Sequence, residues 1–199
     1  MTADHPRPRS VEFIGSFPDP LHPLDPALPE IAVIGRSNVG KSTLINAFVG
    51  QRVARTSRQP GKTQMMNVFR LPGWYLLDLP GYGFARVSKA ERGRFRRLVD
   101  DVVGRRPRLS GVLWLLDVRH PPSADDLTMR SLLAEHGRPT IVALTKADKL
   151  SRSQQLTARR ERARELEVPI DHLLLTSGAR KLGIGELAER LDVVTGRPA

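Results

Sequence analysis

The chain has 199 residues, no cysteine, and a net charge of +11 from 32 Lys and Arg against 21 Asp and Glu. This length most simply holds one domain with a real hydrophobic core, and the lack of cysteine excludes disulfide bridges, thiolate catalysis and Cys-ligated zinc. The basic excess favours a polyanionic partner, although an Arg-rich genome composition also produces such an excess. No apolar run approaches the roughly 20 residues that span a bilayer, and residues 1–10 do not resemble a signal peptide, so we expect a cytoplasmic protein.

The N-terminal part of the chain is expected to lie outside the main domain. Residues 11–15 suggest a short strand or a segment packed on the surface, and the following segment carries five prolines, which forbid a regular helix. We therefore divide the chain into an N-terminal extension with a Pro-rich connector (1–29), a folded domain (30–195) and a C-terminal tail (196–199).

A phosphate-binding loop is predicted at residues 35–42, which read Gly-Arg-Ser-Asn-Val-Gly-Lys-Ser. An apolar run enters this loop and a helical pattern leaves it, which is the context that the motif requires. Gly35 and Gly40 allow backbone N–H groups to turn toward phosphates at the N-terminus of a helix that ends near Gly50. Lys41 is expected at the β- and γ-phosphates, and Ser42 offers its hydroxyl to Mg²⁺.

Two further segments have the composition of nucleotide switches. The basic loop 51–65 contains Thr63, which is expected to bind Mg²⁺ and to sense the γ-phosphate; an ordinary flexible loop is the alternative. Asp78 ends an apolar strand and precedes Leu-Pro-Gly. This pattern predicts a carboxylate near Mg²⁺ and the N–H of Gly81 at the γ-phosphate, although Asp-x-Pro-Gly is also a common turn.

The remaining sequence alternates strand and helix patterns after one hairpin. The hairpin is expected at 67–71 and 75–79, around Pro-Gly. Buried strands are expected at 111–118, 140–144 and 170–175, and helices at 88–103, 123–136, 151–165 and 185–194. This order predicts an α/β fold, a three-layer P-loop domain with a mostly parallel sheet, one antiparallel hairpin strand and helices on both faces. The ligand of such a sheet lies beyond the carboxyl ends of its strands.

The helix predicted at 88–103 begins with a capping box, formed by Ser88 and Glu91, and has a strongly basic face. The arginines of this face and of the residues just after it are Arg92, Arg94, Arg96, Arg97, Arg105, Arg106 and Arg108. Charge runs are usually solvated, but this one borders a loop that is expected to move with the nucleotide. The pattern is therefore compatible with a solvated face or with a nucleic-acid contact.

The tetrapeptide Thr-Lys-Ala-Asp at 145–148 follows a predicted strand and indicates guanine as the base. Guanine presents its N1–H and 2-amino groups side by side, and the carboxylate of Asp148 accepts both, whereas adenine would leave that carboxylate unpaired. The Lys146 stem is expected over the ring, and backbone N–H groups of 176–178 at the guanine carbonyl oxygen. Asp117 and His120 are more simply structural.

These segments together resemble the EngB/YsxC (YihA) family of bacterial GTPases, of the translation-factor-related class. The resemblance is carried by residues 35–42, 55–64, 78–83 and 145–150. It implies that 30–195 is a GTPase domain of this type, that it binds GTP and GDP, and that the protein acts in assembly of the large ribosomal subunit. It also implies a need for the protein in normal septation, the ribosomal subunit or its precursor as partner, no membrane partner and a monomeric chain.

The resemblance also assigns the site residues. It places catalysis on Lys41, Thr63 and Gly81, with Asn38 as a candidate potassium ligand, and Mg²⁺ on Ser42, Thr63 and, through water, Asp78. The residues expected to contact GTP are Gly35, Arg36, Ser37, Asn38, Val39, Gly40, Lys41, Ser42, Thr43, Gly61, Lys62, Thr63, Gln64, Met65, Asp78, Leu79, Pro80, Gly81, Thr145, Lys146, Ala147, Asp148, Leu175, Thr176 and Ser177.

Two positions differ from Ras-like GTPases. Tyr82 follows Gly81 where those enzymes carry a water-orienting Gln, so we expect slow intrinsic hydrolysis. Thr145 replaces the usual Asn, which predicts a weaker side-chain tie to the P-loop and readily exchanged nucleotide. The expected function is a slowly hydrolysing GTP switch. Three alternatives stay open: a nucleotide-gated RNA-binding module in which hydrolysis is incidental, an ATP-using small-molecule kinase, and a membrane-surface GTPase.

Overall fold

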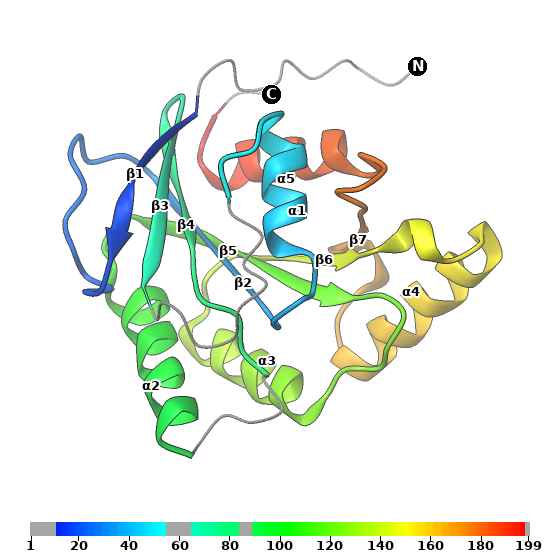
Figure 1. Cartoon of the computed structure of the whole chain (residues 1–199). Coiled ribbons are helices and arrows are strands. Elements are labelled where there is room, and N and C mark those ends of the chain that lie inside the picture. The colour runs from blue at the N-terminus through cyan, green and yellow to red at the C-terminus, as the bar shows by residue number, and fades with distance from the viewer. Residues whose placement is uncertain (1–10, 55–64, 84–88, 198–199) are drawn as a thin grey trace.

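The computed structural model describes residues 11–54, 65–83 and 89–197, in which seven strands form one sheet in the order β1-β3-β4-β2-β5-β6-β7 (Figure 1). The strands are β1 Glu12–Phe17, β2 Glu30–Gly35, β3 Met66–Leu71, β4 Trp74–Asp78, β5 Leu109–Asp117, β6 Thr140–Thr145 and β7 Leu173–Leu175. Strand β3 runs antiparallel to both of its neighbours, and the other neighbouring pairs are parallel. The predicted fold class is confirmed.

Helices cover both faces of the sheet. They are α1 Lys41–Val49, α2 Lys89–Asp100, α3 Ala124–His136, α4 Arg152–Leu166 and α5 Ile184–Val194, with short helical turns at Asp101–Arg105, Ala147–Lys149 and Ile170–His172. Figure 1 shows α1 and α5 on one face and α2, α3 and α4 on the other. The helices on each face pack against the sheet and form a separate hydrophobic cluster with it. All six residues of β2 are buried, because both faces of this strand are covered.

Two helices begin with a serine that caps them. Ser123 caps α3 in a reciprocal pair of bonds with Asp126, and Ser151 does the same with Gln154 at the start of α4. The residue expected to cap α2, Ser88, lies outside the described residues. None of the described helices is both long and apolar enough to cross a bilayer.

Three elements add to the sequence expectation or differ from it. Strand β1 agrees with the short strand that was one of two expectations for residues 11–15, and it pairs with β3, so the sheet includes a segment upstream of residue 30. The strand expected at 170–175 consists of a helical turn at Ile170–His172 followed by only three strand residues. The helix expected to continue to residue 103 changes to a π-helical turn at Asp101–Arg105.

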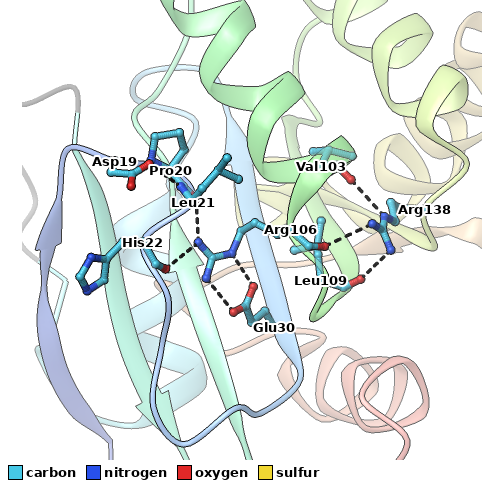
Figure 2. A network of polar contacts seen from close by, with 9 residues as sticks. All are labelled: Asp19, Pro20, Leu21, His22, Glu30, Val103, Arg106, Leu109 and Arg138. Atoms are coloured by element: carbon cyan, nitrogen blue, oxygen red, sulfur yellow. Dashed lines mark hydrogen bonds and ion pairs between the residues drawn. The ribbon is translucent and has the colours of Figure 1, made fainter.

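A buried ion pair anchors the Pro-rich connector to the sheet (Figure 2). The Arg106 guanidinium donates to both carboxylate oxygens of Glu30, at 2.5 and 2.7 Å, and also to the carbonyls of Pro20 and His22, at 2.6 and 3.2 Å. Arg138 donates to the carbonyls of the chain around Arg106, including that of Val103 at 3.0 Å. The connector is therefore held at the end of the sheet where β2 and β5 begin.

Candidate functional site

The loop between β2 and α1 has the backbone geometry of a phosphate cradle. Gly40 caps α1 with a φ of 102°, and Asn38 also has a positive φ of 63°. A Cβ on Gly35 would lie 2.9 Å from the Val39 side chain, so this position requires glycine. The first turn of α1 carries no acidic residue, which leaves its N–H groups and the positive end of its dipole available to an anion.

Lys41 joins this loop to the end of β4. Its ammonium group forms an ion pair with the Asp78 carboxylate, which is 5% exposed and also accepts from the Asn67 amide at 3.4 Å. Ser42 follows as the second residue of α1. The parallel pairing of β2 with β4 brings this lysine, hydroxyl and carboxylate to one edge of the sheet.

The segment after Asp78 continues along the P-loop, backbone against backbone. The Ser37 N–H donates to the Tyr82 carbonyl at 2.8 Å, and the Tyr82 N–H donates to the Gly35 carbonyl at 3.3 Å. A Cβ on Gly81 would lie 2.8 Å from the Ser37 hydroxyl oxygen. That hydroxyl is buried and is the one buried side-chain polar atom without a hydrogen-bond partner among the described residues.

The Tyr82 side chain points away from the P-loop into the layer under α2 and α3. Its hydroxyl accepts from the Trp114 indole N–H and donates to the Asp126 carboxylate, both at 2.8 Å. Burial, followed by the nearby charge of Asp126, raises the pKa of Tyr82 well above its usual range. A phenol held by two buried partners is not available to orient a water molecule, as the Gln of Ras-like enzymes does.

The segment 145–148, which the sequence predicts to recognise the base, is tied directly to the P-loop. The Thr145 hydroxyl lies 2.6 Å from the Val39 carbonyl and 3.0 Å from that of Leu116. Thr145 therefore keeps a side-chain tie to the P-loop, while the weaker overall tie and the ready exchange of nucleotide expected relative to Asn stay predictions. Lys146 adopts a φ of 59° and its ammonium group donates to the Asn38 carbonyl at 2.6 Å, so its stem crosses the loop beside Gly40.

Asp148 is held in place by the loop that follows β7. The Ser177 hydroxyl donates to its carboxylate at 2.5 Å, and this hydrogen bond lowers the pKa of Asp148. The Ala147 N–H donates to the Thr176 carbonyl at 3.0 Å, which joins the two loops through their backbones. A Cβ on Gly178 would meet the backbone of α1 at 2.6 Å, so this loop packs tightly on the helix that starts at the P-loop.

Asp117 belongs to this site, although the sequence favoured a purely structural role. It lies at the end of β5, accepts from the Arg119 guanidinium at 2.7 and 2.9 Å, and pairs with Lys146 at 2.9 Å. Burial by itself raises the pKa of Asp117, but the hydrogen bonds from Arg119 and Lys146 outweigh it and lower the pKa to about 2. In the sequence, the one sign of this placement was that Asp117 ends a predicted buried strand, and in the structure this strand lies next to β6.

A cavity of about 250 Å³ opens between the P-loop and the segment after β5. Its lining includes Asn38, Asp117, Arg119, His120 and Lys146. The loop of His120 therefore borders the predicted site, although no hydrogen bond in the described residues assigns the imidazole a role there.

The structure brings together most of the residues that the sequence assigned to GTP. The described members of that set lie in the P-loop, at the end of β4 and in the loops after β6 and β7. Met65 lies just before β3 and is 38% exposed. The assignments to Gly61, Lys62, Thr63 and Gln64 fall outside the described residues, so the magnesium role of Thr63 stays a prediction.

Known proteins with similar sequences are GTP-binding proteins, in agreement with the phosphate-binding geometry of the P-loop. Residues 30–146 match the model of a family described as 50S ribosome-binding GTPase. The chain is 43% identical to the probable GTP-binding protein EngB of Desulfitobacterium hafniense, over 83% of this chain and 84% of that protein. It is 41% identical to the EngB protein of Gemmatimonas aurantiaca, over 96% and 95%.

A solved structure shows the same fold. The crystal structure of a probable GTP-binding protein engB superposes with a TM-score of 0.70 at 26% identity, covering 84% of this chain and 98% of that one. The similarity in sequence and the similarity in fold therefore point to the same family for the chain that carries the P-loop, the Asp78 segment and the Asp148 loop. The chain belongs to the EngB family of GTP-binding proteins and is a GTPase.

Proposed function

We propose that this GTPase acts in the cytoplasm in assembly of the large ribosomal subunit, binding the subunit precursor with GTP and leaving after hydrolysis. The observation that carries the proposal is the convergence of Lys41, Asp78 and Asp148 at the carboxyl edge of the sheet, in a family described as 50S ribosome-binding. The net charge of +11 supports an RNA-rich partner. A requirement in septation would follow indirectly, from defective ribosome supply.

Recognition of guanine rests on Asp148 and Lys146. The Asp148 carboxylate is charged at neutral pH, as the lowered direction of its pKa also favours, so it accepts from the guanine N1–H and 2-amino groups. Asp117 and the Asn38 carbonyl hold the Lys146 ammonium, which leaves the stem to lie over the base. The Ser177 hydroxyl keeps the Asp148 carboxylate oriented.

The residues at the phosphate end fit a magnesium ion. The Ser42 hydroxyl and the buried Asp78 carboxylate are hard oxygen donors next to the P-loop, and Mg²⁺ prefers a few such donors together with phosphate oxygens and water. Thr63 is our proposed further ligand. When bound, the ion supplies neutralisation of charge on the phosphate oxygens.

Hydrolysis depends on positioning and electrostatics. Lys41 and the N–H groups of the P-loop stabilise charge on the β- and γ-phosphates, the Gly81 N–H orients the γ-phosphate, and water attacks in line. No described side chain at this edge is an evident general base, and Tyr82 is held elsewhere. The intrinsic rate is therefore low, and an activating partner can raise such rates by as much as roughly 10⁵-fold.

Asn38 is our candidate ligand for a potassium ion that would offset transition-state charge. It is exposed and lies in the P-loop with a positive φ. GTP hydrolysis on isolated large subunits should then be faster in potassium than in sodium buffer, and Asn38→Ala should remove the difference. Equal rates of the unmodified protein in the two buffers would refute this assignment.

The decisive experiment is co-sedimentation with large ribosomal subunits and their precursors, in the apo, GDP and non-hydrolysable GTP-analogue states. Binding only with the analogue supports the proposal, and binding indifferent to nucleotide contradicts it. The buried position of Tyr82 also favours a second candidate, a nucleotide-gated RNA-binding module in which hydrolysis is incidental. Normal release of the protein from subunits while the analogue is still bound would support that candidate.

A further inference from the structure

The exposed side of α2 carries several arginines that have no hydrogen-bond or ion-pair partner among the described residues. Arg92, Arg94 and Arg97 are exposed, and none of them has a hydrogen bond or ion pair to another described residue. Arg96, on the same helix, lies 3.9 Å from Asp100. Arg94 and Arg97 are three residues apart, so they lie on adjacent turns of the helix, and such like-charged neighbours destabilise a helix slightly. No contact within the described residues offsets this cost.

Gly93 lies among these arginines, and the fold does not require glycine there. A Cβ at this position would meet only the Arg97 side chain, at 3.7 Å, which is ordinary contact. Glycine inside a helix destabilises it relative to alanine. By contrast, a Cβ at Gly104 would lie 2.8 Å from the His136 ring. The lack of a side chain at Gly93 therefore suits the close approach of something outside the molecule.

The location of α2 connects this side of the helix with the nucleotide site. The helix follows the segment 78–83, whose backbone bonds to the P-loop. The ring of Phe95, on the inner side of α2, lies 5.6 Å from the ring of Tyr82 in that segment. The arginines are thus carried by the element that packs directly on the segment in contact with the nucleotide loop.

The side chains on the exposed side of α2 indicate which kind of anionic partner this surface fits. The exposed large hydrophobic side chains of the described residues are Phe13, Met65, Leu127, Leu156, Ile170, Leu182 and Val193. None of them is on α2. Insertion into a membrane surface requires apolar side chains, and the buried core of a protein interface is depleted in charge. Arginines without apolar neighbours fit phosphate groups, which guanidinium binds in a bidentate manner.

We infer that the α2 arginines Arg92, Arg94 and Arg97, with Gly93 between them, form the surface by which this protein docks on the phosphate backbone of RNA. The inference rests on the proposed function and specifies which side of the molecule meets the RNA. Phosphate contacts position a protein on RNA without reading its sequence, so binding through this surface depends on salt and tolerates different sequences.

The test uses a labelled RNA duplex, the full-length chain and two matched triple variants. One replaces Arg92, Arg94 and Arg97 by Gln, and the other makes the same change at three exposed arginines of α4, namely Arg152, Arg160 and Arg164. We expect the α2 variant to lose roughly tenfold or more in RNA affinity, and the negative slope of its log K against log salt to become shallower by about 2 to 3. The α4 variant should retain the affinity and slope of the unmodified protein. Equal losses in both variants, or none in the α2 variant, overturn the inference.

Gly93→Ala provides an independent measurement. It should raise the melting temperature, because alanine favours the helix, and should weaken RNA binding, because its Cβ blocks the approach. A higher melting temperature with unchanged RNA affinity overturns the role of Gly93. Unchanged GTP affinity shows that each variant is folded.

Co-sedimentation with large subunits separates the two proposals. If the unmodified protein does not bind subunits, the ribosomal function fails, while the RNA duplex still decides the α2 surface. If it binds subunits and the α2 variant binds them equally well, the surface assignment fails and the function stands. Loss of binding to anionic lipid vesicles in the α2 variant, with RNA affinity unchanged, would identify a membrane surface instead.

Discussion

At the scale of single residues, the proposed selection of guanine by Asp148 depends on matching carboxylate acceptors to the donors of the base. The Ser177 hydroxyl orients the Asp148 carboxylate, and the same hydrogen bond lowers the pKa of Asp148, which further favours the charged form. An amide in its place would present one donor, which guanine cannot accept at that edge but the 2-oxo group of xanthine can.

Asp148→Asn should therefore change the nucleotide preference from GTP to xanthosine triphosphate. We expect the affinity for GTP to fall by roughly a hundredfold or more, since a site built for hydrogen bonding rejects a mismatched partner strongly. Competition binding with the two triphosphates measures the change. Ser177→Ala is the control, because it loosens the carboxylate without changing which partner it prefers. An unchanged preference in Asp148→Asn would remove this residue from the base site.

Asp117 should contribute stability that depends on pH. The hydrogen bonds from Arg119 and Lys146 lower its pKa from 3.8 to about 2 in the folded chain, so the folded state favours the ionised carboxylate. The resulting stabilisation is complete above about pH 4 and is lost as the pH falls toward 2. Asp117→Asn should lower the free energy of unfolding at pH 7 by about 1 kcal/mol. Urea unfolding of both proteins between pH 7 and 3 should show this difference shrinking below pH 4, and a constant difference would contradict the assignment.

At the scale of elements, tertiary contacts tie segments that are far apart in the chain. Thr145, at the end of β6, bonds to the P-loop carbonyl of Val39, so the base loop and the phosphate loop form one rigid edge. At the other end of the sheet, Arg106 joins the connector to β2 through Glu30 (Figure 2). The contribution of the Arg106–Glu30 ion pair to the free energy of unfolding can be measured.

Arg106→Leu should destabilise the protein by about 3–5 kcal/mol, because it leaves the buried Glu30 carboxylate without its partner. Adding Glu30→Leu should recover part of the loss, since the unpaired charge is then removed. Arg105→Leu is a matched control in the adjacent position, as Arg105 is exposed and, among the described residues, pairs only with Asp101. It should cost less than about 1 kcal/mol. Similar urea midpoints for Arg105→Leu and Arg106→Leu would show that the buried pair contributes little.

At the scale of the whole molecule, binding of GTP should stabilise the entire domain, because its ligand contacts come from loops along one edge of the sheet. A ligand at 100 times its Kd adds about 2.7 kcal/mol to the free energy of unfolding, which raises the melting temperature of a domain of this size by about 5–10 °C. Thermal unfolding with GTP and Mg²⁺ measures the shift. Lys41→Ala should show none, and ATP should produce none in the unmodified protein. An equal shift with ATP would revive the kinase alternative.

Much of the fold and of the site could be predicted because they depend on local chemistry. The P-loop is recognisable since its glycines are needed for backbone conformations that other residues avoid, as the φ of Gly40 shows. Buried parallel strands are apolar on both faces, so β5 and β6 appear as continuous apolar runs. The starts of α3 and α4 follow from side chains that bond to their own helix.

The tertiary structure decided what depends on contacts between distant segments. Strand β1 is an edge strand only because β3 offers it a partner, and the orientation of Tyr82 follows from Trp114 and Asp126, which lie far along the chain. Asp117 joins the site only because β5 and β6 end side by side. The sequence by itself determined the kind of fold, the nucleotide and the P-loop, since these need particular residue types at short spacing. Packing decided which side chains face the ligand, because neighbours across the sheet are not neighbours in sequence.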